Sequence, residues 1–163
     1  MIRHPLAVLE GLHTPVRTGG VTNKVGYFGL TRRHPDGTAK KHHGVDFLAP
    51  EMWPVVAAHD ADVTAARPDR AGRDAGYGLL IKLVGGQYAT RYAHLHEMFV
   101  KAGDRVRKGN LIALVGRTGN LSTATPTHLH FELRVSQLEL RVTTSDVWTV
   151  VDPLLYLEGY EVR

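Results

Sequence analysis

Two histidines separated by one residue, His128 and His130, lie within residues 127–135, where apolar side chains alternate with other residues. That alternation predicts a half-buried strand, and residues two apart on a strand face the same side. Both imidazoles would therefore share one face, while Leu129 and Phe131 pack on the other. Neutral imidazole is a common metal ligand. The pair therefore indicates either a metal site or a solvated strand face that carries two histidines.

A second candidate is the pair His42 and Asp46, four residues apart, which follows a polar loop. That spacing places both side chains on one side of a strand or of a helix. Gly44 and the β-branched Val45 disfavour a helix. An imidazole and a carboxylate suit a divalent ion such as zinc. The alternative is an ion pair at the end of a surface loop.

A third candidate, His94, follows a predicted strand over residues 87–93. Two histidines and one carboxylate are the protein ligands of a catalytic zinc site that keeps a fourth position open for water. Zinc would lower the pKa of that water towards about 7 and polarise a bound carbonyl. The two histidines left over could then move protons and stabilise an oxyanion. The pattern favours metal-assisted hydrolysis.

The composition is that of one soluble globular domain, with 163 residues, 43% hydrophobic residues and 22% charged residues. The formal charge of +4 and the pI near 9.5 favour anionic partners. No arginine-rich run interleaved with aromatic residues occurs, so no nucleic-acid partner is expected. The chain has no cysteine, which excludes thiolate zinc sites.

The apolar run at residues 6–9 ends at Glu10 and is too short for a signal-peptide core or a membrane span. We therefore expect a mature form, a phage lysin or a secreted effector, with no membrane span. The sequence does not predict an oligomeric state.

Short apolar segments separated by turn signals predict a mostly β, single-domain fold built on an antiparallel sheet. No amphipathic helix longer than about two turns is expected. Residues 1–20 are expected to be an extended lead-in, and the loops are expected at 31–41 and 67–76. The strands are expected at 19–30, 55–58, 61–66, 77–84, 87–93, 111–116, 127–135, 138–142 and 147–151, with a hairpin at Gly85-Gly86 and a helical turn at 152–157.

The order of five motifs resembles the M23 zinc metallopeptidases of the lysostaphin or LytM type, over roughly residues 20–157. The motifs are His42-x-x-x-Asp46, Tyr92-Ala93-His94-Leu95, Gly103-Asp104-x-Val106-x-x-Gly109, Thr118-Gly119 and His128-Leu129-His130-Phe131-Glu132. The resemblance implies a LytM-like, duplicated-hybrid-motif-like domain over residues 21–163, with a groove over an antiparallel sheet. It also implies one Zn²⁺ per chain and endopeptidase cleavage of peptidoglycan peptides at the cell wall or in the periplasm.

Carried onto this sequence, the resemblance implies that His42, Asp46 and His130 are the zinc ligands. His94 and His128 would be the catalytic pair, acting as general base or as stabilisers of the oxyanion. His43 is expected to be exposed rather than coordinating. The other histidines are expected to be surface or structural residues: His4, His13, His34, His59 and His96.

The sequence also departs from the family pattern. The loop from Thr118-Gly119 to His128 is longer and lacks a second glycine, and Met52-Trp53 replaces the usual Gly-Thr. Tyr27 is the nearest tyrosine upstream of the first ligand and is not assigned a role. The scissile bond, glycyl-glycine or D-Ala to a diamino acid, therefore stays open, and no substrate-binding residues are assigned.

Two other functions fit parts of the sequence. The first is a catalytically silent LytM-type module that activates a cell-wall amidase. Such modules typically lack one or more metal ligands, whereas all five key positions are filled here. The second is a biotinyl or lipoyl carrier, indicated by the turn Gly103–Gly109. A carrier needs a lysine in a tight turn, often beside methionine, and no such turn occurs.

Overall fold

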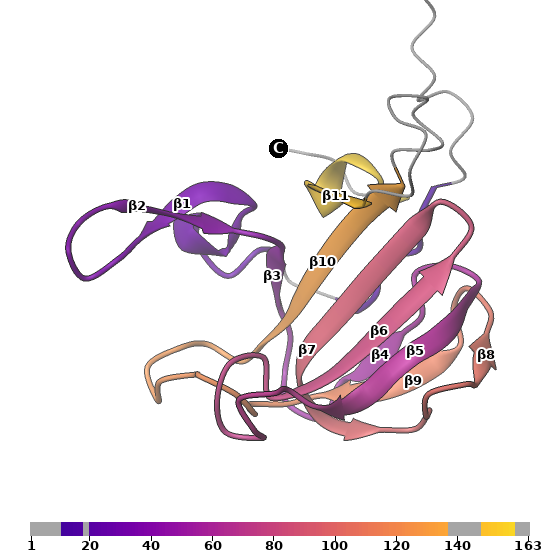
Figure 1. The fold of residues 1–163 in the computed structure, drawn as a ribbon. Helices are drawn as coiled ribbons and strands as arrows, with labels where there is room; N and C mark the ends of the chain where they lie inside the picture. The colour runs from indigo at the N-terminus through magenta and orange to yellow at the C-terminus, as the bar shows by residue number, and fades with distance from the viewer. Residues whose placement is uncertain (1–10, 18–19, 137–147, 159–163) are drawn as a thin grey trace, which may run out of the picture.

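The structure is a computed structural model that describes residues 11–17, 20–136 and 148–158. Within those residues nearly all regular structure is β (Figure 1). The elements are η2 (Lys24–Gly26), β1 (Gly29–Arg33), β2 (Ala39–His42), β3 (Val45–Leu48), β4 (Pro54–Val56), β5 (Ala61–Pro68), β6 (Leu79–Gly85), β7 (Tyr88–Met98), β8 (Arg105–Val106), β9 (Leu111–Val115), β10 (His128–Ser136), β11 (Trp148–Val151) and η3 (Pro153–Leu155).

The main sheet is antiparallel and has the strand order β11-β10-β7-β6-β5-β8. Three further strands branch from it: β3 pairs with β10, β9 with β7, and β4 with β9. The predicted mostly β, antiparallel fold is therefore confirmed. No helix in the described part of the chain is long and apolar enough to cross a membrane.

Strand β10 shows why the alternating sequence folds in this way. Leu129, Phe131, Leu133 and Val135 are fully buried in the hydrophobic core. Phe131 packs there against Tyr92 of β7, with 5.2 Å between the ring centroids. The intervening residues of β10 face the other side of the sheet, as the period of two requires. The apolar core therefore anchors the strand from one side and leaves the other side for polar side chains.

A hairpin between β6 and β7 is present, as predicted, but its two-residue turn is Gly86-Gln87 and not Gly85-Gly86, because Gly85 ends β6 and pairs with Tyr88. Gly86 has a φ of +55°, which suits a tight hairpin turn. The expected helical turn over residues 152–157 is the 3-10 helix η3, in which Asp152 caps the backbone N–H of Leu154 at 3.0 Å. The strand expected at 138–142 lies outside the described residues. Leu12 and Val16 join the core, and the domain boundary at residue 21 stays a prediction.

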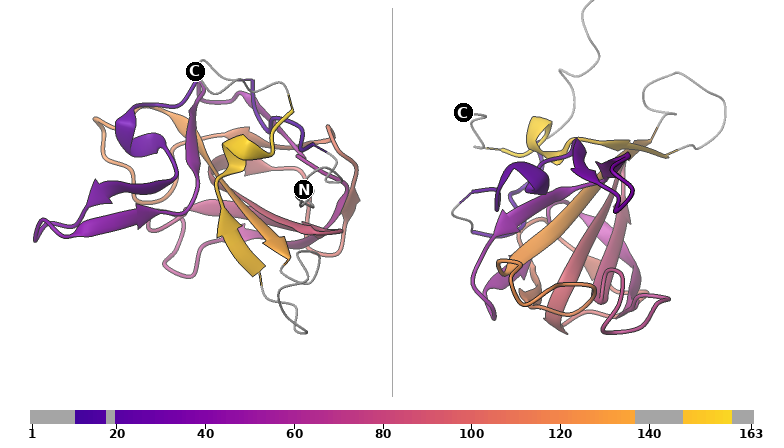
Figure 2. Two further views of the ribbon diagram at one scale, coloured as in Figure 1. Left: turned by 90° about the horizontal axis from the view of Figure 1, so that it is seen from above. Right: turned by 90° about the vertical axis from the view of Figure 1, so that its left-hand side faces the viewer.

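The strand predicted at 19–30 and the loop predicted at 31–41 are wrong. The chain instead forms η2 and then a two-stranded sheet, β1 with β2, which projects beside β3 (Figures 1 and 2). Most of its residues are exposed or half-buried on both faces, so it lacks the alternation that marks a half-buried strand. The predicted turn at Pro35, Asp36 and Gly37 is confirmed, because these residues form the tip of this hairpin.

Candidate metal centre

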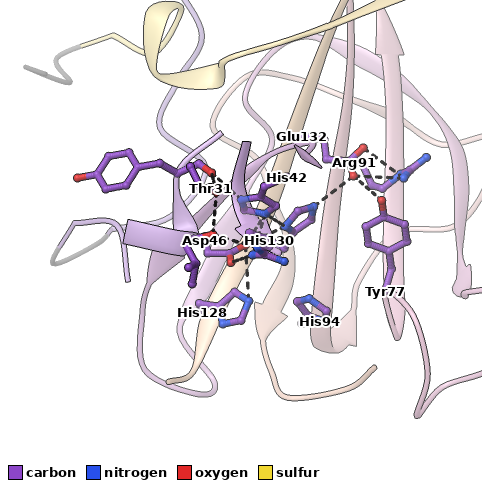
Figure 3. Close-up of polar contacts among 12 residues, drawn as sticks. Thr31, His42, Asp46, Tyr77, Arg91, His94, His128, His130 and Glu132 are labelled. Atoms are coloured by element: carbon purple, nitrogen blue, oxygen red, sulfur yellow. Dashed lines mark hydrogen bonds and ion pairs between the residues drawn. The ribbon is translucent and has the colours of Figure 1, made fainter. Parts of the chain in front are cut away.

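Three side chains from three strands meet at one end of β10: His42, Asp46 and His130 (Figure 3). Because β3 pairs with β10, Asp46 lies directly opposite His130. His130 Nδ1 is 2.8 Å from Asp46 Oδ1 and 3.0 Å from His42 Nε2. One ligand atom of each residue lies within 4.8 Å of the others, and all three residues are buried. Two imidazole nitrogens and a carboxylate oxygen are a donor set that a divalent transition metal accepts.

The second ring nitrogen of His42 and of His130 is held by a hydrogen bond. His42 Nδ1 donates to the carbonyl of Tyr27 at 2.9 Å, and His130 Nε2 donates to Glu132 Oε1 at 3.2 Å. His42 therefore presents Nε2, and His130 presents Nδ1, towards Asp46. Such outer partners fix the tautomer and the ring orientation of a metal-binding histidine.

The carboxylate of Asp46 is oriented from both sides. Its Oδ1 faces the histidines, while its Oδ2 accepts a hydrogen bond from the Arg32 guanidinium. Burial alone would raise the pKa of Asp46, but the hydrogen bonds from His130 and His42 outweigh it and hold that pKa well below its usual range. The centre therefore carries an ionised carboxylate at neutral pH.

His130 lies between two carboxylates, Asp46 and Glu132. Burial lowers the pKa of its imidazole, but the hydrogen bonds to both carboxylates raise it above its ordinary value. A metal ion can bind Nδ1 only where that nitrogen carries no proton, which couples metal affinity to pH.

Glu132 is fully buried and has four polar partners. It accepts a hydrogen bond from the Tyr77 hydroxyl at 2.6 Å, and its Oε2 forms ion pairs with Arg91 at 3.2 Å and Arg134 at 2.9 Å. Burial would raise its pKa, but the hydrogen bond and charge of His130 and the charge of Arg91 lower it to about 2. Burial and the negative charge of Glu132 raise the pKa of Tyr77 to about 12.

His94 and His128 lie beside the three-residue cluster, with 5.1 Å between their ring centroids. His128 Nδ1 donates to the Pro126 carbonyl at 2.8 Å, and its Nε2 lies 3.7 Å from Asp46 Oδ1. His94 Nδ1 donates to the Thr118 carbonyl at 2.9 Å. Each neutral ring therefore keeps Nε2 as a proton acceptor. Burial lowers the pKa of both imidazoles, to about 3 for His94, where the charges of His130 and His128 add to the effect.

The backbone at His94 is unusual. Its φ of +61° is rare for a residue other than glycine, and the pairing of β6 with β7 is irregular at this point. Such an irregularity can redirect a side chain out of the regular strand pattern. Gly119 leaves space for the His94 side chain, because a Cβ at Gly119 would lie 2.9 Å from His94 Nδ1 and 2.7 Å from the backbone nitrogen of Gly78. The Thr118-Gly119 motif therefore supports His94 in its position.

The structure brings together all five histidine and aspartate residues that the sequence singled out. Sequence reasoning missed the residues around them: Arg32, Tyr77, Arg91 and Glu132. Of these, Glu132 carried a signal, because it continues the period of two after His128 and His130. His13, His34 and His43 are exposed, and His59 is buried as a structural residue with its Nε2 3.0 Å from Thr90 Oγ1. His96 is half-buried near Glu51, and His4 lies outside the described residues.

An antiparallel β domain that gathers two histidines and an aspartate next to two further histidines has the donor set of a metallohydrolase. The sequence model of peptidase family M23 matches residues 40–142, and the chain belongs to this family. A curated relative, the peptidoglycan DD-endopeptidase ShyB of Vibrio cholerae, is 37% identical over 121 residues, which are 74% of this chain and 27% of the relative.

Two solved structures support the same assignment. A zinc-containing peptidase from Vibrio cholerae superposes with a TM-score of 0.64 and 34% identity, covering 77% of this chain and 37% of that one. The catalytic domain of lysostaphin from Staphylococcus simulans superposes with a TM-score of 0.61 and 30% identity, covering 82% of this chain and 90% of the lysostaphin domain. The chain spans about a quarter of the length of ShyB.

Proposed function

We propose that this chain is a zinc-dependent endopeptidase that hydrolyses peptide cross-links or bridges of bacterial peptidoglycan at the cell wall or in the periplasm. The observation that carries the proposal is the convergence of His42, Asp46 and His130 beside His94 and His128. The chain's membership of family M23, and its similarity to a peptidoglycan DD-endopeptidase and to lysostaphin, support the choice of substrate.

In this proposal His42, Asp46 and His130 would hold one zinc ion through the atoms that face one another, Nε2, Oδ1 and Nδ1. The donor set fits, because it combines two imidazole nitrogens with a carboxylate that is ionised at neutral pH. When bound, zinc supplies a Lewis acid and a water of lowered pKa. The hydrogen bonds of Tyr27 and Glu132 keep both imidazoles in the tautomers that this arrangement needs.

His94 and His128 would handle protons at Nε2. Both donate Nδ1–H to a backbone carbonyl, so the neutral rings accept at Nε2, and their lowered pKa values keep them neutral at pH 7. One imidazole would take a proton from the attacking water at Nε2, stabilise the oxyanion of the tetrahedral intermediate while it is protonated, and then deliver the proton to the leaving amine. The other imidazole would stay neutral beside the reacting groups.

The alternative function is a silent module that activates an amidase, and such modules typically lack one or more metal ligands. Here all three ligands and both neighbouring histidines are present and oriented by hydrogen bonds. The centre therefore favours the enzyme over the silent module.

Two alanine variants separate metal binding from proton transfer. His130→Ala is expected to lose the zinc, whereas His128→Ala is expected to keep the zinc and to lose about 100-fold or more in turnover, the usual contribution of general acid–base catalysis. His43→Ala is the control, because His43 adjoins a ligand but is exposed. Zinc content by mass spectrometry and release of muropeptides would be measured together. Full zinc content in His130→Ala, or nearly normal turnover in His128→Ala, would contradict these roles.

A further inference from the structure

A line of basic side chains crosses the sheet next to the metal centre. Lys82 of β6 pairs with Arg91 of β7, and Arg91 pairs with Glu132 of β10. Directly paired residues share a face of the sheet, as do residues two apart on one strand. Lys82, Arg91 and Arg134, called here the cationic row, therefore lie on the same face as His130. Figure 3 shows Arg91 close to Glu132, next to His130.

The positive charge of the cationic row is only partly neutralised. Arg91 and Arg134 share a single carboxylate, the buried Glu132. Within the described residues Lys82 forms no ion pair. Burial lowers the pKa of Lys82, and the positive charges of Arg91, Arg67, Arg134 and Arg70 lower it further.

The surroundings of the cationic row do not cancel this surplus. Arg67 lies on the same face, because it pairs with Leu80, two residues before Lys82. The carboxylate of Asp69 offsets one charge near Arg67 and Arg91, and its oxygens are already engaged by the backbone N–H groups of Arg70 and Tyr77. Among the residues that the structure describes, four cations thus face two carboxylates, and the side chains of Arg91 and Arg134 are 15% and 25% exposed. A solvent-borne anion can reach the row.

The location of the row indicates which anion it meets. Glu132 contacts His130 of the proposed metal centre and also contacts Arg91 and Arg134. Only the Glu132 side chain therefore separates the cationic row from the metal centre. Lys82 lies two strands from β10, which is about 10 Å at the usual strand spacing. An extended peptide advances about 3.4 Å per residue, so a substrate held at the centre would pass the row within about three residues of the scissile bond.

We propose that the cationic row is a subsite for free carboxylates of the peptide substrate, and that it selects acidic stem peptides over neutral glycine bridges. This inference rests on the proposed endopeptidase function. Guanidinium groups and an ammonium group bind carboxylates through charge-assisted hydrogen bonds, and they bind a carboxamide much more weakly. The row would therefore set specificity without taking part in bond cleavage.

The test uses two synthetic cross-linked stem-peptide dimers. They are identical except that one carries free carboxylates where the other carries carboxamides. The dissociation constant, from fluorescence anisotropy, and kcat/KM are measured for the zinc-loaded wild type and for Lys82→Gln. Lys101→Gln is the matched control, because Lys101 is 86% exposed and lies outside the row. We expect the wild type to prefer the acidic dimer, and Lys82→Gln to lose about threefold to tenfold of that preference through KM. The control should keep the preference, and added salt should weaken it.

Two results would overturn the proposal: equal binding of both dimers by the wild type, or a preference that Lys82→Gln leaves unchanged. Inorganic polyphosphate serves as a competitor, and binding of polyphosphate that depends on Lys82, without any preference between the dimers, would assign the row to a wall polymer instead. If neither dimer is cleaved while the binding preference depends on Lys82, the proposed function fails and the subsite stands. Comparison of the unfolding midpoints confirms that Lys82→Gln is folded.

Discussion

Replacement of Glu132 by glutamine tests how the metal centre is held in place. The change keeps the size and shape of the side chain but removes its negative charge. Glu132 accepts the Nε2–H of His130 and the hydroxyl of Tyr77, and it is the shared carboxylate of Arg91 and Arg134. A neutral amide leaves two half-buried arginines without this counter-charge and weakens the orientation of His130.

The size of the effect follows from the environment of Glu132. Its pKa falls from 4.5 to about 2 in the folded protein, and at about 1.4 kcal/mol per pH unit the ionised carboxylate contributes about 3 kcal/mol at neutral pH. Because the folded pKa is depressed, this contribution is complete above pH 4.5 and is lost as the pH falls towards 2. Loss of the residue that hydrogen-bonds to a metal-binding histidine usually weakens metal binding by about 10-fold to 100-fold.

We therefore expect Glu132→Gln to lower the free energy of unfolding of the metal-free protein by about 3 kcal/mol and to weaken zinc binding by about 10-fold or more. Urea unfolding measures the first quantity, and competition with a chromophoric chelator measures the second. Glu97→Gln is the matched control, because Glu97 is exposed on β7. Unchanged zinc affinity in a folded Glu132→Gln variant would refute the argument that Glu132 orients His130.

Two further predictions concern the pH dependence of stability and the backbone beside His94. Burial lowers the pKa of His59 to about 4, so the unfolded chain binds more protons between pH 6.5 and 4. Stability should fall by up to about 3 kcal/mol over that range, and His59→Gln should flatten the fall in urea unfolding at pH 7.5, 5.5 and 4.5. Gly119→Ala should lower turnover by displacing His94. Gly72→Ala is the control, because the φ of Gly72 is similarly positive but a Cβ there would meet nothing within 4 Å. This control should only add backbone strain of about 1–3 kcal/mol. Equal kcat values for the two alanine variants would show that Gly119 does not support His94.

The strand with the two histidines could be predicted because its pattern is local. Alternation along residues 127–135 predicts the strand and the shared face of His128 and His130, and the apolar half of the pattern is buried in the core. The meeting of His42, Asp46 and His130 depends instead on the pairing of β3 with β10, which joins segments more than 80 residues apart. Resemblance to the M23 peptidases supplied that information, and periodicity did not.

The parts that the sequence did not predict depend on register and on exposure. The hairpin β1–β2 is exposed or half-buried on both sides, so its sequence lacks a periodic signal and predicts a loop at Arg32 instead of a strand. Arg91 reaches Glu132 because the register of β7 with β10 pairs the two residues. Tyr77 reaches Glu132 from the segment just before β6. Neither contact is encoded in a local sequence pattern. The positive φ of His94 follows from an irregular pairing that the apolar pattern does not record.

The central claim, a zinc centre that hydrolyses peptidoglycan, is tested most directly by metal content and turnover on the same sample. The purified chain would be assayed on peptidoglycan before chelation, after chelation, and after zinc is added back, with products identified by mass spectrometry. The account predicts one zinc per chain, loss of cross-linked muropeptides, loss of activity with the chelator and recovery with zinc. Cleavage that persists in the metal-free protein, or a zinc-loaded chain that cleaves no type of peptidoglycan, would contradict it.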